Sequence, residues 1–592
     1  MKRKVAFVPV LLILLAIGST GAPTTEQQIV FTDITVIDAT GGPAKPHMMV
    51  MVSGDKIAGV QRYNRNRVPK TARVVNGQGK FLIPGLWDMH VHWYDERYLP
   101  LFIANGVTGV RQMWGMEVHQ QWRQRMKDGS LLGPRQSIAS PIIDGPKPVW
   151  AGSLAVANAE EAREAVRMSR KDGADFIKVY NLLPRDAYFA IADESKKEGI
   201  PFAGHIPYAV SLTEASEAGQ QSVEHLTGVL LAASSQEEQI RKQLIEAMSS
   251  SEPYRAATAI LMRRSKDLRD TFDPIKAAAV YAQLARSRTW QTPTLTVLRA
   301  MANLDDPKFT SDARLRYMPH SIRESWNPEN DFRLKQRTAD DWLEAKRTYD
   351  LYVRIVGDMR RSSVPLLAGT DTLNPFCFPG FSLHDELALL VTAGFSPMEA
   401  LQAATRNAAS YLGTLDSYGT VEKGKTADLV VLNANPLDDI RNTQKIAGVM
   451  IGGRFFPKPA LDKMLADVEA LASLKSISEP LLKTITESGA SAAVEQYRRL
   501  KREQSASYEF GEDELIGLGY QLISMKKVPE AIEMFKLEVD TYPQYWNAYD
   551  SLADAYKASG DKDLAVANYK RSLDLNPKNT NAITQLKALS QK

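Results

Sequence analysis

Short apolar runs broken by turn residues dominate residues 28–83. The runs are "IVFTDITVID", "MMVMVSGDKIAGV" and "ARVVNGQGKFLI". Clusters of Asp, Gly and Ser separate them, at 38–42 and 53–55. Alternating apolar and polar positions bounded by such residues predict β-strands joined by tight turns.

Residues 84–416 alternate between short apolar runs and amphipathic stretches. Ala159–Lys171, for example, has helical spacing and precedes the apolar run "GADFIKVY". Eight such units predict an α/β fold, a (β/α)8 TIM barrel. The strands are expected at 86–92, 108–113, 136–142, 176–180, 202–206, 222–226, 292–297 and 366–371. The long gaps 227–291 and 298–365 are expected to cover the barrel mouth.

Strand patterns return in "ADLVVLNANPLDDI" and "IAGVMIGGRFF", and the chain from residue 459 onward is helical in pattern. Residues 505–592 repeat with a period of 34, a spacing typical of tetratricopeptide repeats. Residues 459–504 are expected to be a helical linker or a degenerate repeat. A plain helical bundle is the alternative, which the shared period disfavours. The matching positions are Leu515, Leu518, Gly519, Leu522, Ala531, Phe535 and Pro543, then Tyr549, Leu552, Ala553, Tyr556, Ala565, Tyr569 and Pro577.

Residues 1–22 have the pattern of a secretory signal peptide. Basic residues at 2–4 precede an apolar run at 5–17 and small residues at 18–22. An uncleaved anchor is the alternative, although the run is short for a membrane span. We therefore expect an exported protein, periplasmic or extracellular, with no membrane span after signal removal. The single cysteine, Cys377, excludes an intramolecular disulfide.

The charge balance argues against a polyanionic partner. The net charge is +4, and three of the positive charges lie in residues 2–4. The remaining balance is near neutral, so no nucleic-acid partner is expected.

Potential metal ligands recur where the predicted barrel strands end. His90 and His92 are two residues apart on one strand, so both point to the same face. The other candidates are Lys178, His205, His225 and Asp371. Each alone has an ordinary explanation: a hydrogen-bonded core histidine, a paired lysine, or an aspartate that caps a helix. Strand ends converge at the carboxyl rim of a barrel, however, so together they predict a metal site.

Imidazole and carboxylate ligands suit Zn²⁺ and similar divalent ions. Lys178 fits such a site only if its charge changes, because an ammonium group repels a metal ion. A neutral lysine can react with CO₂ to form an anionic carbamate. The carbamate has two oxygens and can bridge two ions that share a hydroxide.

These segments resemble the amidohydrolase superfamily over roughly residues 28–458. The resemblance is carried by "LIPGLWDMHVH", "NGVTGVRQM", "GADFIKVY", "AGHIP", "SVEHL", "LLAGTD" and "GTVEKGKTADLVVLNANPLDDI". It is strongest to the imidazolonepropionase-like and prolidase-like branch. The resemblance implies that residues 23–83 and 417–458 form a small composite β-sandwich beside the barrel at 84–416.

The resemblance also implies the roles of the candidate residues. His90, His92 and Asp371 would hold one divalent ion, and His205 and His225 a second. Carboxylated Lys178 would bridge them, and Asp371 would also move the proton. Lys178 argues against imidazolonepropionase activity itself, because that enzyme is mononuclear and uses no bridging lysine.

Two further residues are candidates for binding substrate. Tyr208 lies three residues after His205, and Arg111 lies on the second predicted strand. Each is open to a structural interpretation, and Arg111 in particular to pairing with a buried acid. Gln112 stands where many relatives have Asp.

The leading hypothesis is an exported metal-dependent hydrolase of amide bonds, acting on dipeptides or N-acyl amino acids through a metal-bridging hydroxide. One alternative is a mononuclear hydrolase of cyclic amides or a deaminase. The other is a partner-binding tetratricopeptide protein with an accessory barrel. The repeats would bind a protein partner or mediate self-association.

Overall fold

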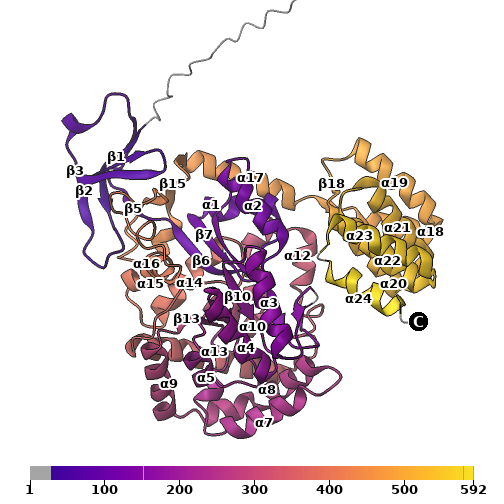
Figure 1. The fold of residues 1–592 in the computed structure, drawn as a ribbon. Coiled ribbons are helices and arrows are strands. Elements are labelled where there is room, and N and C mark those ends of the chain that lie inside the picture. The colour runs from indigo at the N-terminus through magenta and orange to yellow at the C-terminus, as the bar shows by residue number, and fades with distance from the viewer. Residues whose placement is uncertain (1–27, 151, 578, 591–592) are drawn as a thin grey trace, which may run out of the picture.

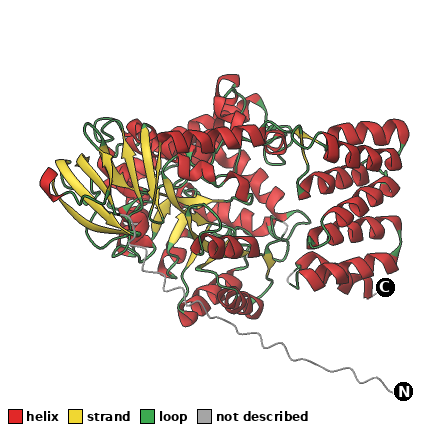
Figure 2. Cartoon of the chain, turned by 90° about the horizontal axis from the view of Figure 1, so that it is seen from above, coloured by secondary structure: helices red, strands yellow, loops and turns green. Residues whose placement is uncertain are grey.

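The computed structural model describes residues 28–150, 152–577 and 579–590. A parallel barrel lies between a β-sheet at one end of the molecule and a helical unit at the other (Figures 1 and 2). The predicted signal peptide, residues 1–22, lies outside the described residues. Within the described part of the chain, no helix is both long and apolar enough to span a bilayer.

One mixed sheet combines the two flanks of the barrel. Its order is β16-β15-β14-β5-β1-β2-β3, with β4 paired to β1. β14 pairs with β5, so strands more than 300 residues apart in sequence are neighbours. The two flanks thus join in one composite unit, whose strands share an apolar core. The strands are β1 Ile29–Val36, β2 Lys45–Ser53, β3 Lys56–Arg62, β4 Arg73–Asn76, β5 Phe81–Pro84, β14 Leu429–Leu432, β15 Ile446–Ile451 and β16 Arg454–Pro457.

Seven parallel strands form most of the barrel, in the order β6-β7-β8-β10-β11-β12-β13. Isolated parallel bridges from Thr372 to Val91 and from Leu366 to Gln291 bring an eighth segment between β6 and β13. The barrel is thus nearly closed, which confirms the predicted α/β barrel class. The strands are β6 Leu86–Val91, β7 Val107–Gln112, β8 Arg135–Asp144, β10 Phe176–Val179, β11 Phe202–Gly204, β12 Ser222–Glu224 and β13 Trp290–Thr292, with β9 Leu154–Ala155 beside β8.

The predicted seventh strand, 292–297, was misplaced. β13 ends at Thr292, and helix α10 begins at Leu295. Thr294 turns the chain with a φ of 47°, and the Glu386 carboxylate accepts hydrogen bonds from the amides of Leu295 and Thr296. A distant residue therefore starts this helix, which local pattern cannot reveal.

The predicted eighth strand, 366–371, makes isolated bridges and forms no regular strand. Gly369 packs so closely on β6 that an added Cβ would lie 3.0 Å from the His90 amide nitrogen. Asp371 then leaves extended geometry, with a φ of 60°. Both features bend the segment out of a regular ladder while keeping it against β6.

Helices pack around the barrel where sequence and capping agree. In α3, Asn158 caps the first turn by accepting from the amides of Glu160 and Glu161, and α4 ends at Gly199 with a φ of 62°. These helices are α1 Pro100–Ala104, α2 Glu117–Lys127, α3 Ala159–Lys171, α4 Arg185–Glu198, α5 Leu212–Glu217, α9 Pro274–Arg286, α14 Phe381–Thr392, α15 Pro397–Ala403 and α16 Arg406–Tyr411.

The two long gaps fold into helices, of which α8 and α13 pack on one another (Figure 1). The first gap supplies α6 Val229–Ala232, α7 Glu237–Ala247 and α8 Pro253–Asp270 before α9. The second contains the later part of α10 Leu295–Asn303, then α11 Pro307–Thr310, α12 His320–Ser325 and α13 Ala339–Arg361.

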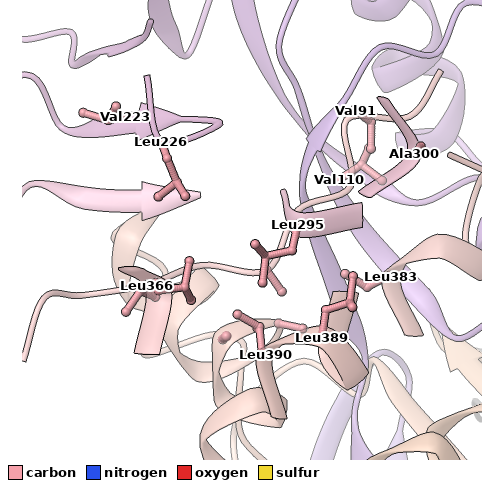
Figure 3. Close-up of a cluster of buried hydrophobic side chains, with 14 of the residues drawn as sticks. Val91, Val110, Val223, Leu226, Leu295, Ala300, Leu366, Leu383, Leu389 and Leu390 are labelled. Atoms are coloured by element: carbon pink, nitrogen blue, oxygen red, sulfur yellow. The ribbon is translucent and has the colours of Figure 1, made fainter. Parts of the chain in front are cut away.

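The strand pleat separates apolar from ligand positions in the barrel. Val91 lies between His90 and His92 in sequence and points to the opposite face. There it joins a buried cluster with Val110, Leu295 and Leu383 (Figure 3). β6 is therefore anchored by apolar packing on one face while its histidines face the other.

The C-terminal part of the chain is a stack of antiparallel helix pairs. α20 and α21 are followed by α22 and α23, which begin 34 residues later in each case. α18 and α19 share the apolar core of α20 and α21, so residues 478–503 belong to this stack. The helices are α17 Lys458–Ala472, α18 Ser478–Ser488, α19 Ala490–Glu503, α20 Glu512–Ser524, α21 Val528–Thr541, α22 Trp546–Ser559, α23 Lys562–Leu575 and α24 Thr580–Ser590.

Candidate metal centre

All six predicted ligands come together at the carboxyl rim of the barrel. His90 lies one residue before the end of β6, His92 directly follows β6, and Lys178 lies near the end of β10. His205 and His225 directly follow β11 and β12, and Asp371 lies near the end of the eighth segment. Residues from five places along the chain thus converge because parallel strands end at one rim.

His90, His92 and Asp371 form the first half of the centre. The Nε2 atoms of His90 and His92 lie 3.3 and 3.2 Å from the same Asp371 oxygen, Oδ1. The two Nε2 atoms are 3.2 Å apart. One donor atom from each residue lies within 4.8 Å of the others, a spacing that suits one divalent ion.

Lys178, His205 and His225 form the second half. His225 Nε2 lies 3.7 Å from Asp371 Oδ2, so the carboxylate faces both halves. The His225 ring centroid is 4.4 Å from that of His90 and 5.0 Å from that of His205. Lys178 is fully buried, and its Nζ has no hydrogen-bond partner.

Hydrogen bonds from outside the cluster orient three of the imidazoles. His90 Nδ1 lies 2.8 Å from Glu224, His205 Nδ1 2.6 Å from Asn181, and His225 Nδ1 2.7 Å from Thr294. Where Nδ1 donates to these oxygens, Nε2 is left with a lone pair. Such outer partners typically fix the tautomer of a metal-binding histidine.

Arg111 lies within the barrel and does not face an open cavity. Its Nη2 donates to both oxygens of Glu224 at 2.8 Å, and its Nη1 donates to Ser222 and Tyr411. The side chain is fully buried. Of the two interpretations of Arg111, the structure favours pairing with a buried acid over contact with substrate.

The protonation equilibria suit metal binding, which needs neutral imidazoles and an ionised carboxylate. Burial lowers the pKa of all three histidines His90, His205 and His225; neighbouring cations reinforce it at His90 and His205, whereas Asp371 opposes it at His225. Burial opposes ionisation of Asp371, but the adjacent His225 and His92 outweigh it and lower its pKa.

Burial also lowers the pKa of Lys178, to about 8. The Lys178 Nζ and the His92 Nδ1 are both buried without hydrogen-bond partners. Unpaired buried polar atoms are costly and rare in folded proteins. Together with the donor set, they fit a centre that holds two divalent ions and a modified lysine.

The backbone is strained at the same positions. His225 and Asp371 have positive φ angles of 57° and 60°, and Leu226 and Thr294 have 55° and 47°. Left-handed geometry is uncommon for residues other than glycine and concentrates at functional sites. Two of these four residues, His225 and Asp371, are candidate ligands, and Thr294 orients His225.

Sequence reasoning missed several supporting residues. Glu224 immediately precedes His225 in "SVEHL", and its carboxylate lies within hydrogen-bond distance of His90 Nδ1. Asp88, two residues before His90, accepts from the amides of His90 and Thr370, and burial raises its pKa to about 7. A buried acid beside each histidine motif was a signal that could have identified both.

Comparisons with known proteins agree with this geometry. Residues 353–456 match the model of the amidohydrolase family. An ochratoxinase of Aspergillus niger is 23% identical over 450 residues, covering 64% of this chain and 76% of the relative. The solved bottromycin amidohydrolase is 25% identical with a TM-score of 0.60, covering 75% of this chain and 90% of that one.

The chain is thus similar to amidohydrolases in part of its sequence and in its fold. Imidazolonepropionase of Pseudomonas syringae pv. tomato is 42% identical over 76 residues, which cover 13% of this chain and 19% of that enzyme. A Xaa-Pro dipeptidase structure, 19% identical with a TM-score of 0.53 over 73% of this chain and 100% of that one, shares the fold. The family and its amide-hydrolysing members support an enzyme that hydrolyses carbon–nitrogen bonds.

Proposed function

We propose that this chain is a metal-dependent amidohydrolase that cleaves the amide bond of a dipeptide or an N-acyl amino acid. One observation carries the proposal. Asp371 lies against histidines of both halves of the centre, at 3.2 Å from His92 and 3.7 Å from His225. A carboxylate in that place can be both a ligand and a proton carrier.

The residues divide between two ion positions. His90, His92 and Asp371 would hold one divalent ion, and His205 and His225 the other. Carboxylated Lys178 would lie between them. Bound Zn²⁺ ions would lower the pKa of a water and polarise the substrate carbonyl.

The chain itself would then move the proton. Asp371, kept ionised by its neighbours, would accept a proton at its carboxylate and pass it to the leaving nitrogen. Tyr208 Oη accepts a hydrogen bond from Asn181 Nδ2 at 3.3 Å. A hydroxyl that accepts one hydrogen bond can still donate its own hydrogen, here to an oxygen of the substrate. Tyr208 therefore remains our candidate for substrate contact.

Metal removal tests the proposal directly. Dialysis against a chelator should abolish hydrolysis of a panel of dipeptides and N-acyl amino acids. Zn²⁺, Co²⁺ or Mn²⁺ should restore it. Hydrolysis that survives complete metal removal would exclude this function.

A mononuclear hydrolase of cyclic amides, or a deaminase, is the second candidate. It is favoured by the compactness of the first half, in which three ligand atoms lie within 4.8 Å of one another without the second half. Elemental analysis decides between the two: about one ion per chain supports the mononuclear enzyme, and about two supports the binuclear one.

We also propose that the protein is exported, on the basis of residues 1–22, and that its C-terminal helices are tetratricopeptide repeats. These repeats would bind a protein partner or mediate self-association. Truncation after Ser473 tests their independence, because α17 packs on barrel helix α1 whereas α18 and α19 share the core of α20 and α21. Unchanged catalysis would make the repeats a separate binding element.

A further inference from the structure

A cavity of about 350 Å³ opens beside the candidate metal centre. His225, Asn181 and Tyr208 form the part of its wall that belongs to the barrel rim. Helices α6, α7, α8 and α13, from the two insertions, form the rest. Its volume lies within the range of small-molecule sites.

The wall contributed by the insertions is mainly apolar. Its members include Leu230, Leu231, Leu244, Leu261, Met262 and Leu268. A group that enters this space exchanges contact with water for contact with hydrocarbon, which favours apolar groups in proportion to their buried area.

The acids in the wall already have partners within the protein. Glu344 forms an ion pair with Arg269, and Asp341 accepts from the Thr338 backbone amide at 2.8 Å. Both carboxylates therefore already stabilise the insertion helices.

The two arginines in the wall differ. Arg241 donates to Glu237 at 2.7 Å and to the Val210 carbonyl at 2.6 Å. Arg337 donates to the Met301 carbonyl at 2.6 Å and packs over the Trp342 ring, but its buried Nε has no hydrogen-bond partner among the described residues. Apart from this one cation the wall is mainly hydrocarbon, where a charged substrate group would lose hydration.

We propose that this cavity is the specificity pocket of the enzyme and binds a bulky apolar group attached to the scissile amide. The group is a medium-length acyl chain or an aromatic or branched side chain. This inference rests on the proposed function, because contact with His225 sets the pocket beside the reacting bond.

Two substrate series test the pocket and assign its side. One series lengthens the acyl group, from N-acetylglycine through N-butanoylglycine and N-hexanoylglycine to N-octanoylglycine. The other enlarges the amine side, from N-acetylglycine to N-acetylalanine, N-acetylleucine and N-acetylphenylalanine. In one series kcat/KM should rise by roughly fourfold for each buried methylene until the pocket is full. Hydrolysis with flat kcat/KM in both series would overturn the inference.

Larger side chains in the cavity wall test the pocket, with a substitution on the exposed side of the same helix as the matched control. Leu261→Trp, on the cavity side of α8, should lower the octanoyl-to-acetyl ratio of kcat/KM, or the corresponding ratio in the amine series, at least about tenfold. Met262→Phe is a milder change should Leu261→Trp fail to fold. Arg263→Trp, exposed on the same helix, should leave the ratio unchanged. An unchanged ratio in both folded cavity variants would contradict the pocket.

Calorimetry separates the pocket from the chemistry. Analogues of N-octanoylglycine and N-acetylphenylalanine in which a ketomethylene group replaces the cleavable amide should bind the intact protein with a negative heat-capacity change, and the cavity variants should weaken binding of one of them. If no amide is hydrolysed but this binding occurs, the proposed function fails and the pocket stands. If amides are hydrolysed but neither ligand binds in this way, the pocket fails and the function stands.

Discussion

The two halves of the metal centre are organised differently. In the first half the candidate ligands touch one another, with His90 and His92 both close to Asp371 Oδ1 at 3.3 and 3.2 Å. In the second half His205 and His225 are oriented by Asn181 and Thr294, as Glu224 orients His90, but of the two only His225 is recorded near Asp371, at 3.7 Å. Lys178 has no hydrogen-bond partner at all at its Nζ.

This difference indicates which half depends on the other. The first half already has a carboxylate to balance an ion, whereas the second has only neutral imidazoles and a lysine. A second ion therefore requires Lys178 to become an anion, or Asp371 to be shared. The predictions below test this asymmetry, from the largest expected effect to the smallest.

Asp371→Asn removes the one carboxylate common to both halves. We expect kcat/KM to fall by roughly 10²–10⁴-fold, because the variant loses the proton acceptor as well as a ligand charge. Steady-state kinetics on the best amide substrate measures it. Asp186→Asn, an exposed position on α4, is the control and should be silent. A loss of less than tenfold in Asp371→Asn would remove Asp371 from the reaction.

Lys178→Met tests the second half alone. Methionine preserves a long apolar stem in the buried site but cannot form a carbamate. Elemental analysis should show bound metal falling from about two ions per chain to about one, with activity reduced about tenfold or more. Lys196→Met, an exposed position on α4, should keep both ions. Two ions in Lys178→Met would show that Lys178 does not bridge.

Glu224→Gln should weaken the first half through His90. We expect a loss of about 10–100-fold in metal affinity, because an amide orients the imidazole less well than a carboxylate. Removing the countercharge of buried Arg111 should also lower the free energy of unfolding by about 3–5 kcal/mol. Metal titration and denaturant unfolding measure the two effects.

Glu386→Gln is the matched control for that experiment. Glu386 is also fully buried, but it caps α10 and binds no candidate ligand. It should reduce stability while leaving metal affinity within about twofold. Equal losses of affinity in both variants would mean that Glu224 acts only through general stability.

The sequence predicted the convergence of the candidate ligands better than it predicted the residues that support them. Periodicity and strand ends were enough to select His90, His92 and Asp371, because strand alternation and barrel topology place such residues at one rim. Glu224 and Asn181 were missed because their roles depend on partners 134 and 24 residues away. The apolar pocket was also beyond reach, since two separate insertions build it.

The errors in the fold have the same origin. α10 starts where Glu386, some 90 residues later in the chain, caps its amides, so local propensity misplaced β13. The flanking segments join through the β5–β14 pair, and no local pattern specifies which edges meet.

The effect of pH on loading the second half should be the smallest of these effects. CO₂ reacts only with the neutral amine, and burial lowers the pKa of Lys178 to about 8. The neutral fraction therefore rises about tenfold between pH 7 and pH 9, whereas an ordinary lysine would stay almost fully protonated over this range. Metal-free protein incubated with Zn²⁺ at constant dissolved CO₂ should gain its second ion about tenfold faster at pH 9. The first ion does not need Lys178, so its loading rate should differ less between the two pH values. If the loading rates of both ions changed equally with pH, binding of the second ion would not depend on the neutral form of Lys178.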